Sequence, residues 1–506
     1  MNPEFTKWPI ILHENEILVS RIHNRSKWRD EIINDAIDYT QDILGLKCSR
    51  FLCNKIIATG HQAIWHHCGI LAKNAITHNF AKSVKGIGLH LILDHDISDT
   101  SIILPKKNND SSWDFEQISI ESIKEKNNIV LEYRRVPAYE KLKYFANKVI
   151  GVNKNQICNN IWENGILNGE SDINMFGNIA NLITYFQAIV NSALGLNILY
   201  LPVSKLCSSD AFFSFLSSIT FNTNDFINCY NNGLRNVQEK FNSYSMNGIA
   251  PLINNDDYKE LPFWLISPKG ERSSLWLKPN GKNNIQIGTS KICLGDLDSS
   301  SIEYRNFQLK KILDNQCYYL RPKAVTLTLF TRLYFADFFV HGVGASCYES
   351  ITDYLLEHYY NITQLKYGTA TSTMNLSFNE NNDDSDNIKR LKSKLRNVQF
   401  NPEKYINRET LENEAIKSLI KMKNIKIYES LNSSLSSCQR RNARDSVSKI
   451  NLELSVYTKN VIQEITLQIA EAQKKIFSKK VFNYREYFFG LFPEDRLRKL
   501  INLNDY

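Results

Sequence analysis

Hydrophobic residues in the first third of the chain alternate between short continuous runs and helically spaced sets. Residues 55–60 form a short β-prone run ending in glycine, and residues 86–93 form a second apolar run that stops at Asp94. Residues 28–43 and 69–82 instead carry apolar side chains at helical spacing. Because strand, glycine turn, helix and strand make a βαβ unit, we expect an α/β protein with a parallel sheet covered on both faces.

The patterns beyond residue 129 predict further elements of both kinds. Residues 139–241 are mostly helical in pattern, and residues 130–135 are a strand candidate. Two apolar runs on either side of Pro268-Lys269-Gly270 predict a hairpin. The last part of the chain predicts an antiparallel helical hairpin or short coiled coil, with amphipathic helices at 388–399, 409–428 and 431–477.

Composition limits the class of protein. The 506 residues are 43% hydrophobic with only 12 Pro, which excludes a disordered or collagen-like chain. The net charge of +8 is mild and no long basic run is evident, so charge gives no reason to expect a nucleic-acid partner. No apolar stretch approaches the roughly 18–20 residues of a membrane span, and Met1–Ile11 lacks the pattern of a signal peptide. We therefore expect a cytoplasmic protein with ten reduced cysteines.

The first candidate site is Thr59-Gly60-His61-Gln62, where the first strand hands over to a helix. In doubly wound sheets this point is a ligand crevice, and the free N–H groups of a helix start can hold a phosphate or carboxylate. The alternative is a turn glycine followed by a half-buried histidine.

Asp94-His95-Asp96 is the second candidate and follows the next strand. Two carboxylates and an imidazole at a sheet edge could bind a cation, orient an amine or act as acid and base. The alternative is a solvated loop cap.

Histidine is concentrated in the same region, since six of the ten lie in one βαβ unit, at positions 61, 66, 67, 78, 90 and 95. No paired-cysteine or H-E-x-x-H spacing indicates zinc, so we interpret His66, His67 and His78 as structural. His61 and His95 form the pair of interest, because a parallel sheet brings the ends of its strands together.

A fourth candidate is His341-Gly342-Val343-Gly344, whose glycines allow a ligand to approach the backbone closely. The loop is similar to an esterase oxyanion loop, but no G-x-S-x-G nucleophile elbow accompanies it. A Walker A loop and a complete G-x-G-x-x-G are also absent from the sequence.

In this order, the segments resemble the bacillithiol-biosynthesis cysteine-adding enzyme family. That family has a T-G-Q-Q-A turn, an E-D-H-D motif, and an R-P segment followed by G-G-P-G-E-x-x-Y. A less characterised branch, with a T-G-H-Q turn, R-P-[RK]-A-x-T-x-T-L-F and an H-G-[IV]-G-[GA] loop, is more similar. The matching segments are Thr59–Ala63, Asp94–Asp96, Arg321–Phe330, His341–Ala345 and Tyr348.

The resemblance implies a Rossmann-like core with a mixed insert and a C-terminal helical hairpin or coiled coil. The corresponding division is 1–140 for the first part of the core, 141–255 for a mostly helical insert, 256–378 for a strand-rich segment with the rest of the core, and 379–506 for the helical tail. The implied activity is that of a ligase, which joins the carboxyl group of cysteine to the amine of a glucosaminyl-malate. A nucleotide such as ATP is a candidate cofactor. The expected partners are small-molecule substrates and, through the helical tail, a second copy of the chain, with no nucleic acid and no membrane.

The implied site combines anion binding with proton transfer. Asp94 or Asp96 would hold the attacking amine, and His95 would relay its proton. His341 with the Gly342 and Gly344 backbone would stabilise an oxyanion. The residues expected to bind the substrate or nucleotide are Thr59, Gly60, His61, Gln62, Arg321, Gly342, Gly344 and Tyr348, with His61 also catalytic.

The chain departs from the family motifs where His61 and His341 replace Gln and Gly and where Leu93 and Ala345 replace Glu. Two other classes therefore stay open. One is a metal-dependent hydrolase or amidase that uses His61, Asp94, His95 and His341. The other is a non-catalytic scaffold built on the helical tail, retaining a Rossmann-like pocket.

Overall fold

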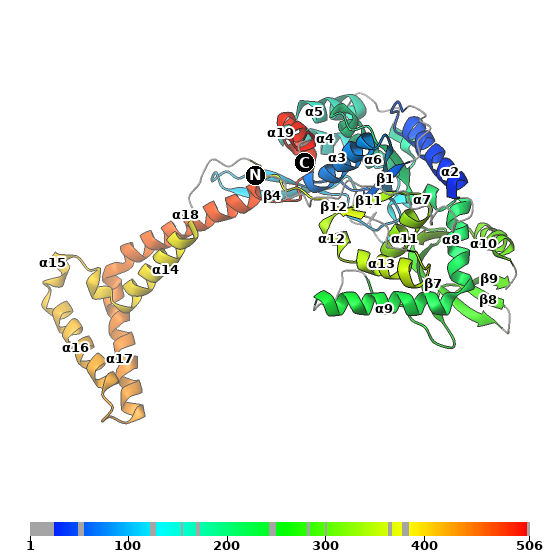
Figure 1. Cartoon of the computed structure of the whole chain (residues 1–506). Coiled ribbons are helices and arrows are strands. Elements are labelled where there is room, and N and C mark those ends of the chain that lie inside the picture. Colours follow the sequence, from blue (N-terminus) through cyan, green and yellow to red (C-terminus); the bar gives the residue numbers. More distant parts are fainter. Residues whose placement is uncertain are drawn as a thin grey trace. The chain divides into compact units, whose positions relative to one another are not determined.

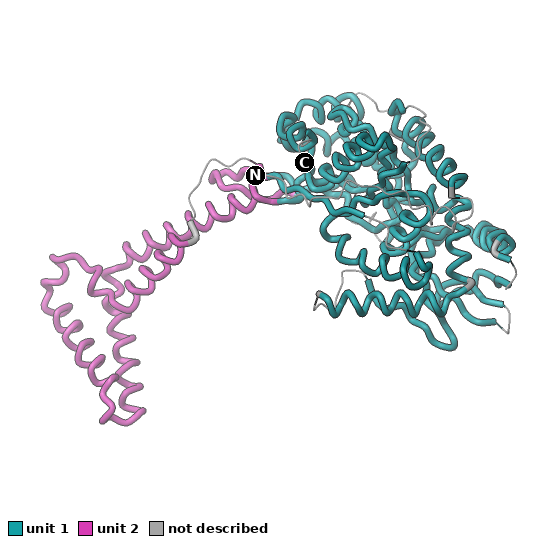
Figure 2. The backbone as a smooth tube through the Cα atoms, viewed as in Figure 1, with its two compact units in different colours: residues 1–104, 117–374, 485–506 teal, residues 105–116, 375–484 magenta. Residues whose placement is uncertain are grey.

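The structure of the chain is a computed structural model, and its residues group into two compact units (Figure 2). Unit 1 comprises residues 1–104, 117–374 and 485–506, and unit 2 comprises residues 105–116 and 375–484. The residues that the structure describes are 25–48, 55–121, 128–152, 155–167, 173–241, 249–280, 284–298, 301–362, 367–376 and 384–502.

Unit 1 is built around a five-stranded sheet in which every pair of neighbouring strands is parallel (Figure 1). Its order is β12-β11-β1-β2-β5. The strands are β1 (Ile56–Gln62), β2 (Ile87–Leu93), β5 (Leu199–Pro202), β11 (Phe338–His341) and β12 (Tyr367–Thr369). The first four residues of β1 and the first six of β2 are buried, as expected for central strands of a parallel sheet, and the residues at their carboxyl ends are half-buried. The prediction of an α/β protein with a parallel sheet is thus confirmed.

A second five-stranded sheet in unit 1 is antiparallel, in the order β10-β6-β7-β8-β9. The pair β6–β7 is the predicted hairpin around Gly270, whose φ of 79° suits a glycine turn. Another sheet has two strands, β3 and β4. The bounds are β3 (Ile102–Lys107), β4 (Trp113–Ile118), β6 (Lys259–Ile266), β7 (Arg272–Asn280), β8 (Asn284–Gly288), β9 (Cys293–Asp298) and β10 (Tyr319–Pro322).

Helices connect and cover the strands of unit 1, and the mostly helical pattern of 139–241 is confirmed. The longer helices are α2 (Arg25–Asp38), α3 (Cys68–Ser83), α4 (Tyr139–Val152), α5 (Gln156–Trp162), α6 (Ile179–Ala193), α8 (Asp210–Phe221), α9 (Thr223–Phe241), α10 (Ile302–Gln316), α11 (Ala324–Tyr334), α13 (Glu349–His358) and α19 (Glu494–Ile501). Shorter helical turns are η1 (Tyr39–Ile43), η3 (Leu131–Tyr133), η4 (Glu163–Leu167), η5 (Ile173–Phe176), α7 (Val203–Leu206), α12 (Val343–Ser346) and η8 (Phe489–Leu491).

The predicted strand at 130–135 is wrong, because this segment folds into the 3₁₀ turn η3. The N–H of Leu131 donates to the carbonyl of Asp96, and the N–H of Glu132 donates to the carbonyl of Asp94. These backbone groups therefore bind the loop after β2 instead of a neighbouring strand.

Unit 2 is dominated by helices that pack in pairs. Leu391 and Val398 of α14 pack with Ile465 of α18, and Ile416 of α16 packs with Leu454 of α17. The helical elements are α14 (Asp384–Phe400), η6 (Pro402–Lys404), α15 (Arg408–Leu411), α16 (Glu414–Leu431), α17 (Ser437–Ser455), η7 (Val456–Thr458) and α18 (Lys459–Phe482).

The single helix predicted over 431–477 is wrong in its continuity. A capping box between Ser436 and Gln439 starts α17 several residues later, and η7 separates α17 from the long helix α18. Apolar spacing continues across η7, so periodicity alone did not reveal this break.

The segment after unit 2 returns to unit 1. The N–H of Phe489 donates to the carbonyl of His66 over 2.8 Å, and Phe488 pairs with His67 in an isolated antiparallel bridge. Trp65 contacts the ring of Phe488, and α19 packs on α3. Residues far apart in the sequence thereby hold the loop between β1 and α3. Among the described residues, no helix combines the length and the apolar character that crossing a membrane requires.

Candidate functional site

The connections of the parallel sheet reverse direction between β1 and β11, and this switch point at the carboxyl ends of the two strands is the candidate crevice. From β1 the chain passes through α3 to β2, on one side of the strand order, whereas from β11 it passes through α13 to β12, on the other side. At such a reversal the two loops diverge from neighbouring strands, and α/β proteins bind ligands there, at the carboxyl ends of the strands. The loop after β11 begins at Gly342. Gly60 and His61, however, pair with Leu91 and Ile92 inside β1, so the predicted glycine turn at Gly60 is wrong and the loop after β1 begins beyond Gln62.

Lys73 on α3 contacts Gly60 near the end of β1 and lies close to Gly342 after β11. Its ammonium Nζ donates to the carbonyl of Gly60 over 2.7 Å. Its Cδ lies 3.9 Å from the position that a Cβ on Gly342 would occupy. The residue is only 3% exposed, and within the described part of the chain no carboxylate forms an ion pair with it. Burial lowers the pKa of Lys73 to about 7.

Four histidines surround this amine. The ring of His66 lies 5.1 Å from that of His61 and 5.6 Å from that of His90. Burial lowers the pKa of all four, to about 3 for His66 and about 4 for His67, and well below the ordinary value for His61 and His90. The charge of Lys73 lowers each of them further. At neutral pH the cluster is therefore one amine among neutral imidazoles, a setting that favours a negatively charged ligand.

Three of these imidazoles have structural partners. A ring nitrogen of His66 lies 3.1 Å from the carbonyl of Gln62, and one of His90 lies 2.8 Å from Oδ1 of Asn74. Nδ1 of His67 accepts from the N–H of Gly69 and caps α3. His61 is half-buried, and its Nδ1 lies 3.3 Å from the carbonyl of Gln62. His67 is half-buried as well but caps α3, so His61 differs from the other three by its place at the carboxyl end of β1.

Thr59 supports the crevice from below. It is fully buried, and its hydroxyl donates to the carbonyl of Val340 over 2.8 Å. This bond adds a side-chain contact between β1 and β11, close to their carboxyl ends, so Thr59 helps to hold the two strands together there.

Asp94, His95 and Asp96 leave β2 at the same edge of the sheet, since Gln62 pairs with Leu93 in register. Asp94 accepts hydrogen bonds from the N–H and the hydroxyl of Ser204. Asp96 forms an ion pair of 2.7 Å with Arg272. Both carboxylates are thus held by neighbouring residues.

His95 is 5% exposed, and its buried Nδ1 has no hydrogen-bond partner. Burial, and then the charge of Arg321, lower its pKa to about 3, so the imidazole is neutral. Burial also raises the pKa of Asp94. The segment thus combines a carboxyl group, Asp94, whose pKa of about 7 lies near neutral pH with a buried, neutral imidazole.

Arg321 faces an internal partner. Its Nε and Nη2 donate to Glu132 over 3.0 and 2.7 Å, a buried bidentate pair. The guanidinium fork that we expected to clamp an anionic ligand is therefore occupied by a carboxylate of the protein itself.

His341 also faces the interior. Its Nε2 lies 3.3 Å from Oε1 of Glu349, which is also bound by Arg332. Although burial raises the pKa of Glu349, His341 and Arg332 together bring it to about 2. Tyr348 packs against the core. Gly344 is exposed, and no atom lies within 4 Å of the position that a Cβ would occupy there. Of the residues predicted on this segment, Gly342 is the one beside Lys73.

Lys73 was missing from the sequence prediction. The pattern that identifies it is a single lysine in the helical run 68–76, whose other residues are mostly apolar, because a helix that is apolar all around is buried. The sequence alone does not reveal the partner of such a lysine.

No protein-family model matches the chain, and no curated protein matches its sequence. Among the described residues, no group of three or more His, Cys, Asp and Glu side chains is arranged to hold a metal ion.

Proposed function

We propose that the chain is an amide-forming ligase with a Rossmann-like core, which joins the carboxyl group of an amino acid to an amine on a small anionic metabolite. Cysteine is the amino acid that the family resemblance implies. The observation that carries the proposal is the buried amine of Lys73, beside Gly60 near the end of β1 and near Gly342 after β11, at the switch point of the parallel sheet.

Lys73 binds the anionic part of the substrate. A carboxylate or phosphate entering the crevice would meet one amine that has no carboxylate partner among the described residues. The bound anion raises the pKa of Lys73, so that binding takes up a proton at neutral pH. The backbone N–H groups of the Gly342 loop supply further donors for the same group.

His61 accepts the proton that the amine loses. In the bond-forming step the amine nitrogen attacks the carbonyl carbon of an activated carboxyl group, whose phosphate or nucleotide leaving group departs with its electron pair. The neutral imidazole of His61, half-exposed beside Gly60, is placed to take the amine proton. Asp94 and His95, which directly follow the neighbouring strand β2, orient the amine.

A comparison of the metabolites of cells with and without this gene tests the proposal, with a third strain expressing the Lys73→Met variant. We expect a low-molecular-weight thiol that contains an amide to disappear in the deletion strain and in the variant strain. Accumulation of an amide in the deletion strain would instead identify a hydrolase. Unchanged metabolite profiles would support a scaffold and overturn the ligase.

A further inference from the structure

Helix α14 of unit 2 carries a basic segment that the overall charge conceals. Residues 389–396 read Lys-Arg-Leu-Lys-Ser-Lys-Leu-Arg, which is five basic residues in eight with no acidic one. Short segments of this composition are typical of nucleic-acid contacts. Leu391 and Leu395 of the same segment pack with α18, so the basic side chains lie on the opposite, exposed side.

The basic excess of the chain is concentrated in this unit. Residues 375–484 contain 20 Lys and Arg against 13 Asp and Glu, whereas the whole chain contains 61 against 53. Residues 105–116, the other part of unit 2, add 2 Lys and 3 Asp and Glu, so unit 2 carries +6 of the net charge of +8 in about a quarter of the chain. A localised excess attracts a polyanion in a way that a dispersed one does not.

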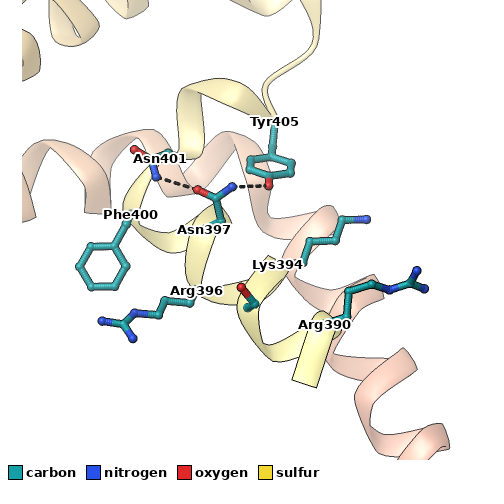
Figure 3. Close-up of a pocket in the computed structure, with 8 residues that line it drawn as sticks. Arg390, Lys394, Arg396, Asn397, Phe400, Asn401 and Tyr405 are labelled. Atoms are coloured by element: carbon teal, nitrogen blue, oxygen red, sulfur yellow. Dashed lines mark hydrogen bonds between the residues drawn. The ribbon is translucent and has the colours of Figure 1, made fainter. Parts of the chain in front are cut away.

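An open hollow of about 730 Å³ lies over the basic segment (Figure 3). Its cations, Arg390, Lys394 and Arg396, are exposed, and no carboxylate in the described part of the chain forms an ion pair with them. All the residues that line it are basic, polar or aromatic: Arg390, Ser393, Lys394, Arg396, Asn397, Phe400, Asn401 and Tyr405.

The end of the hollow adds an aromatic ring and a fixed row of polar groups. Phe400 is 57% exposed, and the guanidinium of Arg396 lies 5.6 Å from the centre of its ring. Asn401 donates to Asn397 over 2.7 Å, and Asn397 donates to the hydroxyl of Tyr405 over 2.9 Å (Figure 3). An exposed ring beside an arginine is a platform on which an unstacked base can lie.

We propose that the exposed surface of α14 binds a single-stranded nucleic acid that crosses the helix, with phosphates at Arg390 and Lys394 on one side, a phosphate at Arg396 on the other side, and one base on Phe400 beside Arg396 (Figure 3). Arg390 and Arg396 are separated by about 9 Å along the helix axis, which exceeds the reach of one phosphate group and favours a backbone of several. The same chemistry serves RNA and DNA, which differ by the 2′-hydroxyl.

Fluorescence anisotropy of the full chain with labelled oligonucleotides tests the proposal. The probes are an oligouridine and an oligothymidine of about 12 nucleotides, within the usual range of site sizes. The variant combines Arg390→Gln, Lys394→Gln and Arg396→Gln. The matched control combines Lys421→Gln, Arg441→Gln and Arg444→Gln, which removes the same charge from exposed positions on α16 and α17.

We expect the α14 variant to weaken binding of at least one probe more than tenfold and the control to weaken it less than threefold. Since single strands release about 0.7 counterion per phosphate contact, the slope of log affinity against log salt should fall by about 2 in the α14 variant. Phe400→Ala should weaken binding at least fivefold, because base stacking is lost. Stronger binding of the uridine probe would identify RNA as the natural ligand, and stronger binding of the thymidine probe would identify DNA.

Three results would overturn the proposal. They are an absence of binding to both probes at about 50 mM salt, equal losses in the α14 and control variants, and α14-dependent binding of phosphatidylserine vesicles without binding of either probe. Circular dichroism of each variant checks that the helices persist. The proposal is independent of the ligase function, because all of its residues lie in unit 2.

Discussion

Replacement of Lys73 by methionine should stabilise the protein and abolish anion binding. Burial lowers the pKa of this amine from 10.5 to about 7. Each pKa unit corresponds to about 1.4 kcal/mol, so the buried amine costs about 4 kcal/mol of folding free energy at pH 7. Methionine removes that cost but leaves the carbonyl of Gly60 without its donor, a loss of about 1–2 kcal/mol. The expected net gain at pH 7 is about 2–3 kcal/mol.

The gain should depend on pH with a definite sign. The unfolded chain keeps this amine protonated up to about pH 10, whereas the folded chain loses the proton near pH 7. Between these values the unfolded state binds more protons, so this group makes wild-type stability rise with pH. The advantage of Lys73→Met should therefore be largest at pH 7 and fall to roughly zero by about pH 9.5.

Urea unfolding followed by tryptophan fluorescence measures this difference in unit 1, which contains six of the seven tryptophans. Lys82→Met is the matched control, because Lys82 lies on the same helix with an exposed side chain. It should change stability by about 0.5 kcal/mol or less at either pH. The variant could instead be less stable than wild type at pH 7, by an amount that does not change with pH. This result would refute the conclusion that burial of the charged Lys73 amine destabilises the folded chain. If the folded Lys73→Met variant still binds the substrate anion, the proposed role of Lys73 in anion binding is refuted.

Three further predictions concern the same unit. His61→Ala and His95→Ala should each lower the rate of the proposed ligase reaction at least a hundredfold with an unchanged circular dichroism spectrum, and wild-type turnover in both would remove them from the proposed mechanism. Arg321→Met should destabilise the chain by about 3–5 kcal/mol in chemical unfolding, because it leaves Glu132 charged and buried, and restoration by a second change of Glu132→Gln would identify the ion pair as the cause. Thr59→Val should cost about 1–2 kcal/mol and weaken substrate binding, since the carbonyl of β11 loses its donor, and an unchanged midpoint in the same unfolding experiment would contradict this.

Local sequence patterns predict an element correctly where its structure is determined mainly by the burial of its own side chains. Strands β1 and β2 and helix α3 fall within a few residues of their predicted bounds, because apolar runs and helical spacing reflect burial directly. The segment 130–135 has the same apolar character, but its N–H groups bind the loop after β2, a partner that no local pattern specifies.

The candidate site divides in the same way. Gly60 and His61 follow from their position at the end of an apolar run, and the structure places them among the last residues of β1, at the switch point of the sheet. Arg321 and His341 could not be judged from sequence, because their carboxylate partners, Glu132 and Glu349, are distant or lie on a separate element. Tertiary contacts, which the local sequence does not specify, decide whether a polar side chain is free to bind a ligand or is already bound to another residue of the protein.

The hydrogen bond from Phe489 to His66 has a consequence for synthesis of the chain on the ribosome. The loop that follows β1 obtains its support from residues made more than 400 positions later. At about 5–20 residues per second, roughly 20–80 s pass between translation of the two segments. During that interval the emerging chain holds Trp65 and its neighbours without their covering segment, as exposed apolar surface that a chaperone could occupy. Completion of this loop is accordingly a late, post-translational event, and a ribosome-bound chain stalled before residue 485 should lack the finished crevice.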